Sequence, residues 1–329
     1  MKNYDIFTKT TKRKFLKIFG VSLLGSLGYG LFTHKKSQID KTYWQGSVLG
    51  APAKIEIHSK DRMLNKHLVT EIDKLIFKYE NIFNLQNVNS EITHLNKNKT
   101  LISPSQELSE VIKKSVFMAD STNGLFDITV QPLWDLYYEH FIINNDNTPL
   151  DTNKIKNALN LVNWRNIEVN EDKITLHGNS SITLNGIAQG WITDKITDLL
   201  SNYGLNNTLV DFGENYALGL YEKSRPWNIL IKGNDAEKIV SLSNKAIATS
   251  GGYGTSFEPT LKNHHIFNTK TGKSSNNFKA VSIISDKAWL SDALSTASLS
   301  MEVISLKNLC TKLEAKAYIQ KDKHFTELA

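Results

Sequence analysis

An aspartate and a threonine stand four residues apart in the segment Ser291–Thr296, whose sequence is SDALST. If this segment is helical, Asp292 and Thr296 lie on one face of the helix. A carboxylate beside a hydroxyl, with no cysteine or histidine near them in sequence, offers only hard oxygen ligands. Such ligands suit Mg²⁺, which binds a few protein oxygens together with water and substrate phosphate. Taken alone, the pattern favours the alternative that Asp292 is a helix N-cap.

A glycine-rich turn occurs earlier, in Thr183–Asp194, which reads TLNGIAQGWITD. We expect a strand to end at Asn185 and Gly186 and a helix to begin at Gly190. Glycine at such a junction lets backbone groups approach a ligand closely, and a helix N-terminus favours phosphate. Many turns without a ligand share this pattern.

Two further segments carry groups that could bind or react. In the first, ATSGGYG at 248–254 precedes the adjacent His264 and His265, and histidine is the usual general acid or base near neutral pH. The alternative is a solvated loop with surface histidines. In the second, STNGLFDITVQPLW at 121–134, Gly124 permits a tight turn before Asp127. Here the alternative is a turn followed by a strand, with Asp127 as a cap.

Several common kinds of site are absent from the sequence. It contains no GxxxxGK[ST], GxGxxG, HExxH or GxSxG motif. The single cysteine, Cys310, excludes an internal disulfide, a cysteine-cluster zinc site and CxxC redox chemistry.

Periodicity predicts elements that could position these groups. We expect helices at 62–83, 106–120, 151–161, 190–203 and 288–304, and strands at 53–58, 166–169, 173–176, 181–184, 208–212, 227–232, 245–249 and 279–285. The strands come in runs and do not alternate regularly with helices. This order predicts an α+β fold, not a doubly wound α/β fold.

The charge of the chain is concentrated at its N-terminus. The chain has 329 residues and a net charge of +6, but residues 1–40 hold eight basic and two acidic side chains. The rest is therefore neutral, which argues against nucleic acid as a partner. A basic stretch, KRKFLK, precedes the apolar run Ile18–Phe32. We therefore expect residues 1–32 to be an export signal or membrane anchor, 33–41 a linker and 42–329 one domain.

That signal predicts export to the periplasm or the outer face of the inner membrane. Lys12 and Arg13 stand where a twin-arginine signal has its arginine pair, so a twin-arginine-like and a Sec route both stay open. No A-x-A cleavage site follows the apolar run, so an uncleaved anchor that attaches the protein to the membrane is an alternative.

The order of these segments resembles the FAD:protein FMN transferases, also called the ApbE family. The family's phrases have counterparts across residues 43–305. They are the Leu49-Gly50 turn, FNLQNVNSEITHLN at 83–96, GLFDITVQPL at 124–133, TLNGIAQGWITD at 183–194, VDFGE at 210–214, AIATSG at 246–251, HIFNTKTG at 265–272 and SDALSTA at 291–297. A match to any one phrase is weak evidence for the family, but matches to all of them in the same order are specific.

The resemblance implies a fold and a reaction. The fold would be a single mixed α/β domain related to the tunnelling T-fold. Such enzymes require Mg²⁺, cleave the pyrophosphate of FAD, release AMP and attach FMN through a phosphoester to a threonine of an acceptor. The acceptor is often an exported or membrane redox subunit, which agrees with the N-terminal segment.

The resemblance also implies roles for individual residues. Mg²⁺ would be held by the Asp292 carboxylate, the Thr296 hydroxyl and the backbone carbonyls of Gly186 and Ser295. His265 would assist the proton transfer from the acceptor threonine. The flavin contacts would be Leu49, Gln86, Leu125, Phe126, Asp127, Thr183, Gln189 and Phe267.

The chain departs from the family pattern at positions that concern cofactor affinity. Thr183 replaces an aspartate, Glu214 replaces the second glycine of VxxGG, and Asn268-Thr269 replaces Asp-Pro. Gln86 stands where an aromatic residue is frequent and Leu49 where methionine is usual. The expected metal side chains and His265 are retained, so we expect catalysis to survive.

Two other functions share these residues. An FAD pyrophosphatase would use the same site with water in place of threonine, giving FMN and AMP. A flavin-binding protein without chemistry would be favoured by Thr183 and Glu214.

Overall fold

The computed structural model describes residues 41–328. The helices are α2 (Arg62–Phe83), α3 (Glu91–Asn98), α4 (Gln106–Ser121), α5 (Gln131–Tyr138), α6 (Thr152–Leu159), α7 (Ala188–Asn202), α8 (Ala288–Ser298) and α9 (Val303–Lys312), with short turns η2 (Ile128–Val130), η3 (Glu139–Ile143), η4 (Trp164–Asn166) and η5 (Gly252–Gly254). The strands are β1 (Lys41–Val48), β2 (Ala51–His58), β3 (Thr100–Ile102), β4 (Ile167–Val169), β5 (Lys173–Leu176), β6 (Thr208–Asp211), β7 (Asn215–Leu218), β8 (Trp227–Lys232), β9 (Glu237–Leu242), β10 (Lys245–Ser250), β11 (Ala280–Ser285), β12 (Lys316–Gln320) and β13 (Phe325–Glu327).

The expected N-terminal segments fall almost wholly outside this range. The export signal or anchor at 1–32 is not described, and of the expected linker only its last residue, Lys41, is described, where it begins β1. Between residues 41 and 328, no helix is both long enough and apolar enough to cross a membrane.

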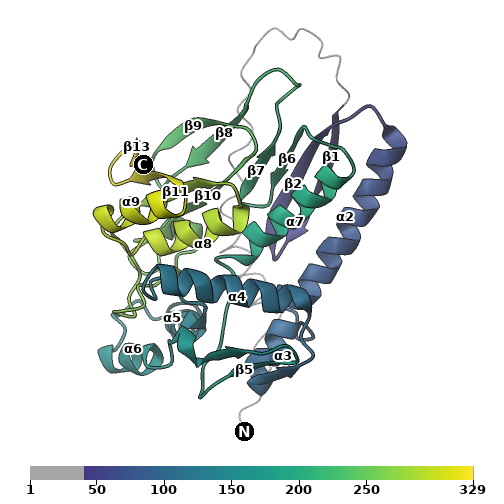
Figure 1. The fold of residues 1–329 in the computed structure, drawn as a ribbon. Coiled ribbons are helices and arrows are strands. Elements are labelled where there is room, and N and C mark those ends of the chain that lie inside the picture. The colour runs from purple at the N-terminus through teal and green to yellow at the C-terminus, as the bar shows by residue number, and fades with distance from the viewer. Residues whose placement is uncertain (1–40, 329) are drawn as a thin grey trace.

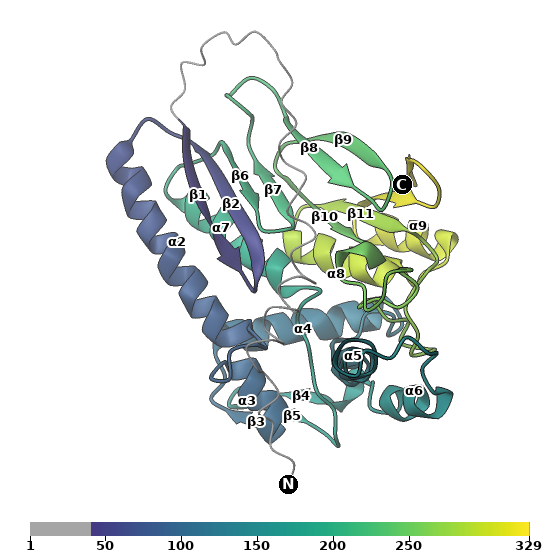
Figure 2. The same cartoon turned by 180° about the vertical axis from the view of Figure 1, so that it is seen from behind.

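An eight-stranded antiparallel sheet forms the centre of the molecule, in the order β1-β2-β6-β7-β10-β11-β12-β13. Helices α7, α8 and α9 cover one face of it, and α2 runs beside β1 (Figure 1). The β8–β9 hairpin packs on the other face, seen in Figure 2. Below the sheet, α4 separates it from the small sheet β3-β5-β4 with α3, α5 and α6. This arrangement confirms the predicted α+β class with a single mixed α/β domain.

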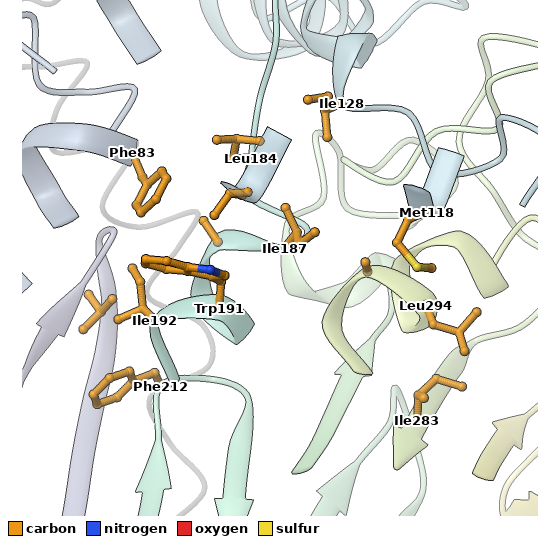
Figure 3. Close-up of a cluster of buried hydrophobic side chains, with 14 of the residues drawn as sticks. Phe83, Met118, Ile128, Leu184, Ile187, Trp191, Ile192, Phe212, Ile283 and Leu294 are labelled. Atoms are coloured by element: carbon orange, nitrogen blue, oxygen red, sulfur yellow. The ribbon is translucent and has the colours of Figure 1, made fainter. Parts of the chain in front are cut away.

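Trp191 anchors the helical layer. Its indole lies edge-on to Tyr79 and Phe83 of α2, with ring centroids 5.2 and 5.5 Å away. Figure 3 shows Ile187, Trp191 and Ile192 of the α7 region in the same apolar cluster as Phe83. Trp191 is almost fully buried, and burying an aromatic side chain of this size stabilises a fold by about 1.5–3 kcal/mol. The N-terminal end of α7 is therefore held firmly against α2.

Most predicted elements are present within a few residues of their expected bounds, but two expectations and one of the alternatives are wrong. Residues 181–184 form no strand, because the amide of Asn96 bonds both the N–H and the carbonyl of Ile182 and takes the place of a neighbouring strand. Residues 288–304 form two helices, since the chain turns between Ser298 and Val303. After Asp127 the chain enters η2 and α5, not a strand.

Candidate functional site

A cavity of about 540 Å³ opens among the ends of the sheet, α8 and the loops before α5 and α7. Its volume falls within the range of small-molecule and cofactor sites. It is lined by residues within the segments 49–52, 125–130, 183–189, 211–215, 229–232, 247–255 and 265–269, together with Trp134, Asp292 and Thr296. Segments that are far apart in sequence thus surround one space.

The glycine-rich turn and the SDALST segment meet at the base of this cavity. The backbone N–H of Gly190, in the first turn of α7, donates to Asp292 Oδ2 at 3.1 Å. In return, the buried carboxylate of Asp194 in α7 accepts the N–H groups of Ala288 and Trp289 at 2.8 and 3.0 Å, which caps α8. Asp292 is therefore an interior residue of α8 and not its N-cap.

The contact between α7 and α8 requires glycine at position 190. A Cβ there would lie 2.4 Å from the Ala288 carbonyl oxygen, and that backbone cannot move away without shifting α8. We expect Gly190→Ala to destabilise the protein by about 1–3 kcal/mol despite the better helix propensity of alanine. Thermal or urea unfolding measures this change, with Ser201→Ala on the exposed face of α7 as the control. Equal stabilities for the two variants would contradict the close packing.

The oxygen groups predicted for a cation are gathered here. Asp292 is 4% exposed and lines the cavity with Thr296 one helical turn later. The Thr296 hydroxyl lies 3.1 Å from the position of a Cβ on Gly186, so only glycine leaves that gap open. Ser250 at the end of β10 bonds the Ser295 hydroxyl at 2.7 Å. Ser295 itself is buried behind the cavity wall.

The cavity is lined by more acidic than basic side chains. Asp127, Asp211, Glu214 and Asp292 line it, whereas Lys232 is the one lysine or arginine among its described walls. Burial raises the pKa of all four carboxyl groups, and the charge of Asp292 raises the pKa of Glu214 further. Burial therefore favours the protonated acids, and a bound cation would stabilise their charged forms. A donor set of carboxylates, a hydroxyl and a backbone group fits Mg²⁺.

His265 lines the same cavity from the loop after η5. Its Nδ1 is 2.9 Å from the Thr255 carbonyl oxygen, which can only accept, so Nδ1 carries the proton and Nε2 keeps a lone pair. Burial, with a smaller effect of the neighbouring His264, lowers the pKa of His265 to about 4. The imidazole is therefore neutral near pH 7 and can accept a proton at Nε2.

Leu49 reaches the cavity through a strained turn. Residues Leu49 and Gly50 connect β1 to β2 with φ of +49° and +83°, the geometry of a two-residue hairpin turn. A leucine in this region is uncommon, and such outliers concentrate at ligand sites. Glu80 of α2 holds the turn by accepting the Leu49 N–H at 2.6 Å.

Most of the predicted flavin contacts lie in the cavity wall. Asp127 lines it and also fixes the loop, since its carboxylate accepts the Thr129 N–H at 2.8 Å and the Trp164 N–H at 3.0 Å. The Gln189 amide donates to the Phe212 carbonyl at 3.2 Å and so ties α7 to β6. Leu125, Phe126, Thr183 and Phe267 also line the wall. Gln86 is exposed beside the Gly50 turn, outside the wall.

The structure adds wall residues that the sequence analysis did not select. Trp134 contributes a ring that stacks on Tyr138 at 4.7 Å, and Tyr253 contributes a buried phenol whose pKa is raised to about 12 by burial. Trp134 lies in the segment 121–134 and Tyr253 in the segment 248–254, both of which the sequence analysis selected. Their position in these segments could therefore have identified them as wall residues. The β8 residues Ile229–Lys232 carried no such signal, because only the folded hairpin brings them to the cavity.

A family model and individual relatives both match most of the chain. A family model described as the ApbE family matches residues 49–319. A FAD:protein FMN transferase of Vibrio cholerae is 26% identical over 281 residues, covering 80% of this chain and 82% of the relative. One of Chlamydia pneumoniae is 27% identical over 263 residues, covering 77% and 80%.

Solved structures show the same fold. The flavin transferase ApbE from Vibrio cholerae superposes with a TM-score of 0.75 at 22% identity, covering 88% of this chain and 96% of the other. The apo form of Pseudomonas stutzeri flavinyl transferase ApbE gives a TM-score of 0.76 at 21% identity, covering 91% and 96%. At these identities the likeness concerns the fold.

Proposed function

Because the chain belongs to the ApbE family, we propose that it is an FAD:protein FMN transferase that acts on a threonine of an acceptor protein with Mg²⁺. In this reaction the threonine oxygen forms a bond to the FMN phosphorus, the bridging P–O bond of the pyrophosphate breaks, and AMP leaves. The threonine proton passes to a base. The observation that carries the proposal is the meeting of Asp292, Thr296 and Gly186 at the base of a cavity walled by aromatic rings.

The cation ligands would be the Asp292 carboxylate, the Thr296 hydroxyl and backbone carbonyls at Gly186 and Ser295. When bound, Mg²⁺ would offset charge on the two phosphates and on the departing AMP. The Gly190 N–H bonds one carboxylate oxygen of Asp292 and holds the side chain in place. A cation could therefore bind the other oxygen without rearrangement of the side chain. The ligand set rests on the donor chemistry and on family resemblance.

His265 would take the proton of the acceptor threonine as the phosphoester forms. The Thr255 carbonyl fixes its tautomer and orientation, which leaves the Nε2 lone pair for the incoming hydroxyl. A base that is already neutral at pH 7 needs no prior deprotonation.

The remaining walls would hold FAD. Phe126, Trp134 and Phe267 offer flat apolar surfaces on which a flavin or adenine ring can stack, and a ring stacked there would exclude water from the reaction. Exclusion of water favours transfer to threonine over hydrolysis, since both acceptors would attack the same phosphorus.

Three outcomes of one assay separate the candidate functions. The full-length protein is incubated with FAD, Mg²⁺ and a purified acceptor domain that carries the target threonine, and the acceptor is analysed by intact mass spectrometry. We expect a mass gain equal to bound FMN, with AMP released in equal amount, and no gain when the threonine is replaced by valine. Free FMN and AMP with an unmodified acceptor would indicate a pyrophosphatase. Intact FAD bound to the protein would indicate a flavin carrier.

The location of the reaction is a further part of the proposal. The basic and apolar pattern of residues 1–32 supports export, with action in the periplasm or on the outer face of the inner membrane. An exported or membrane redox subunit is the acceptor that fits this location. Fractionation of cells that produce the tagged full chain tests it, and a purely cytoplasmic signal would contradict it.

A further inference from the structure

Glu214 is a cavity side chain to which the proposed reaction gives no role. It lies in the β6–β7 turn, between Gly213 and Asn215, and lines the cavity. Its backbone carbonyl accepts the Phe212 N–H at 3.0 Å, so the turn itself is well defined. Its carboxylate Oε2 is buried and has no hydrogen-bond partner among the described residues.

An unpaired buried carboxylate oxygen is costly and therefore informative. Such oxygens are normally paired, and a buried charge is found with a counter-ion or a metal. No lysine, arginine or histidine of the described chain forms an ion pair with Glu214. The nearest influences on its charge are two further carboxylates, Asp292 and Asp211, which repel it. Among these influences, only the backbone N–H of Glu214 itself favours the charged form.

A shared proton does not resolve this arrangement. A protonated Glu214 that donated to Asp292 would show a hydrogen bond between the two, but Oε2 has no partner and Asp292 Oδ2 accepts from the Gly190 N–H. A divalent cation placed between the two acids would satisfy both. It would also account for a buried carboxylate oxygen that has no hydrogen-bond partner in the described protein.

Resting on the proposed function, we propose that Glu214 is a direct ligand of the divalent cation, together with Asp292. A second carboxylate balances the charge of the ion and raises its affinity, because cation affinity rises with the number of charged ligands. The protein would then bind the ion before FAD arrives, whereas a site with Asp292 alone would depend on the substrate phosphates. Glu214 stands where the family pattern has glycine, so this property distinguishes the chain from relatives that keep glycine.

The test measures cation binding in the absence of FAD and acceptor. Metal-free full-length protein is titrated with Mn²⁺, and free Mn²⁺ is followed by electron paramagnetic resonance. We expect Glu214→Gln to weaken binding by about 10- to 100-fold. Glu214→Gly, which restores the family pattern, should do the same and should regain affinity when FAD is added. Thermal unfolding of each metal-free variant shows that it is folded.

Asp211→Asn is the matched control, since it removes one negative charge from the same turn and the Asp211 carboxylate is bonded to the Gly213 N–H. We expect it to weaken Mn²⁺ binding by less than about threefold, as a through-space effect. Equal weakening by Asp211→Asn and Glu214→Gln, wild-type affinity in both Glu214 variants, or no Mn²⁺ binding by the wild type without FAD would each overturn the proposal. Because no FAD or acceptor is present in these titrations, their outcome is separate from that of the transfer assay.

Discussion

Replacing Asp292 by asparagine should reduce the rate of flavin transfer by about 10²–10⁴-fold and weaken divalent cation binding in parallel. The amide keeps the size of the side chain but loses the charge that offsets a cation, and metal stabilisation of phosphoryl transfer is worth several kcal/mol. The Gly190 N–H would still find an acceptor in the amide oxygen, so the junction of α7 and α8 should persist. The initial rate of transfer is measured with FAD and Mg²⁺, from the flavin fluorescence that stays on the acceptor after it is denatured.

Asp286→Asn is the control for this variant, because Asp286 is an exposed carboxylate just before α8 and pairs only at the surface with Lys245. It should transfer flavin at the wild-type rate. If Asp292→Asn also transfers flavin at that rate, then Asp292 does not hold the ion, and the proposed chemistry at the base of the cavity is wrong.

Replacing His265 by glutamine should also lower the transfer rate, by about 10²–10⁴-fold, but leave cation binding intact. Glutamine can occupy the space and donate to the Thr255 carbonyl, yet it cannot accept a proton at neutral pH. Because burial lowers the pKa of His265 to about 4, the wild-type imidazole remains neutral over pH 6–8 and its protonation contributes no change of rate there. The acceptor assay gives the rate, and Mn²⁺ titration gives the binding.

The contrast between the two active-site variants identifies the role of His265. Loss of Mn²⁺ binding in His265→Gln would mean that the histidine supports the metal site and not proton transfer. His177→Gln changes an exposed histidine directly after β5; it serves as the control and should behave as wild type. Partial rescue of a His265→Gly variant by added imidazole would support a direct role in proton transfer.

Amphipathic periodicity was sufficient to predict the long helices. In α2 the buried positions Leu68, Ile72, Tyr79 and Phe83 recur at helical spacing, and Asp61 caps the first turn through the Leu64 N–H. Such signals are local, because the residues that define the helix are also those that bury one of its faces. The strand predicted at 181–184 had no comparable basis, since its backbone partner is a side chain 86 residues away in sequence.

The sequence by itself determined which chemical groups the protein has. The SDALST and TLNGIAQG segments, His265 and the ordered phrases around them indicated hard oxygen ligands, a general base and a family, because these properties reside in residue types and short spacings. Only the tertiary structure decided how the groups are combined. The capping of α8 by Asp194, the burial of Glu214 Oε2 and the approach of β8 to the cavity depend on contacts between residues far apart in the chain. Burial and charge at such contacts set both the pKa of a carboxylate and its need for a partner, and neither property is encoded locally.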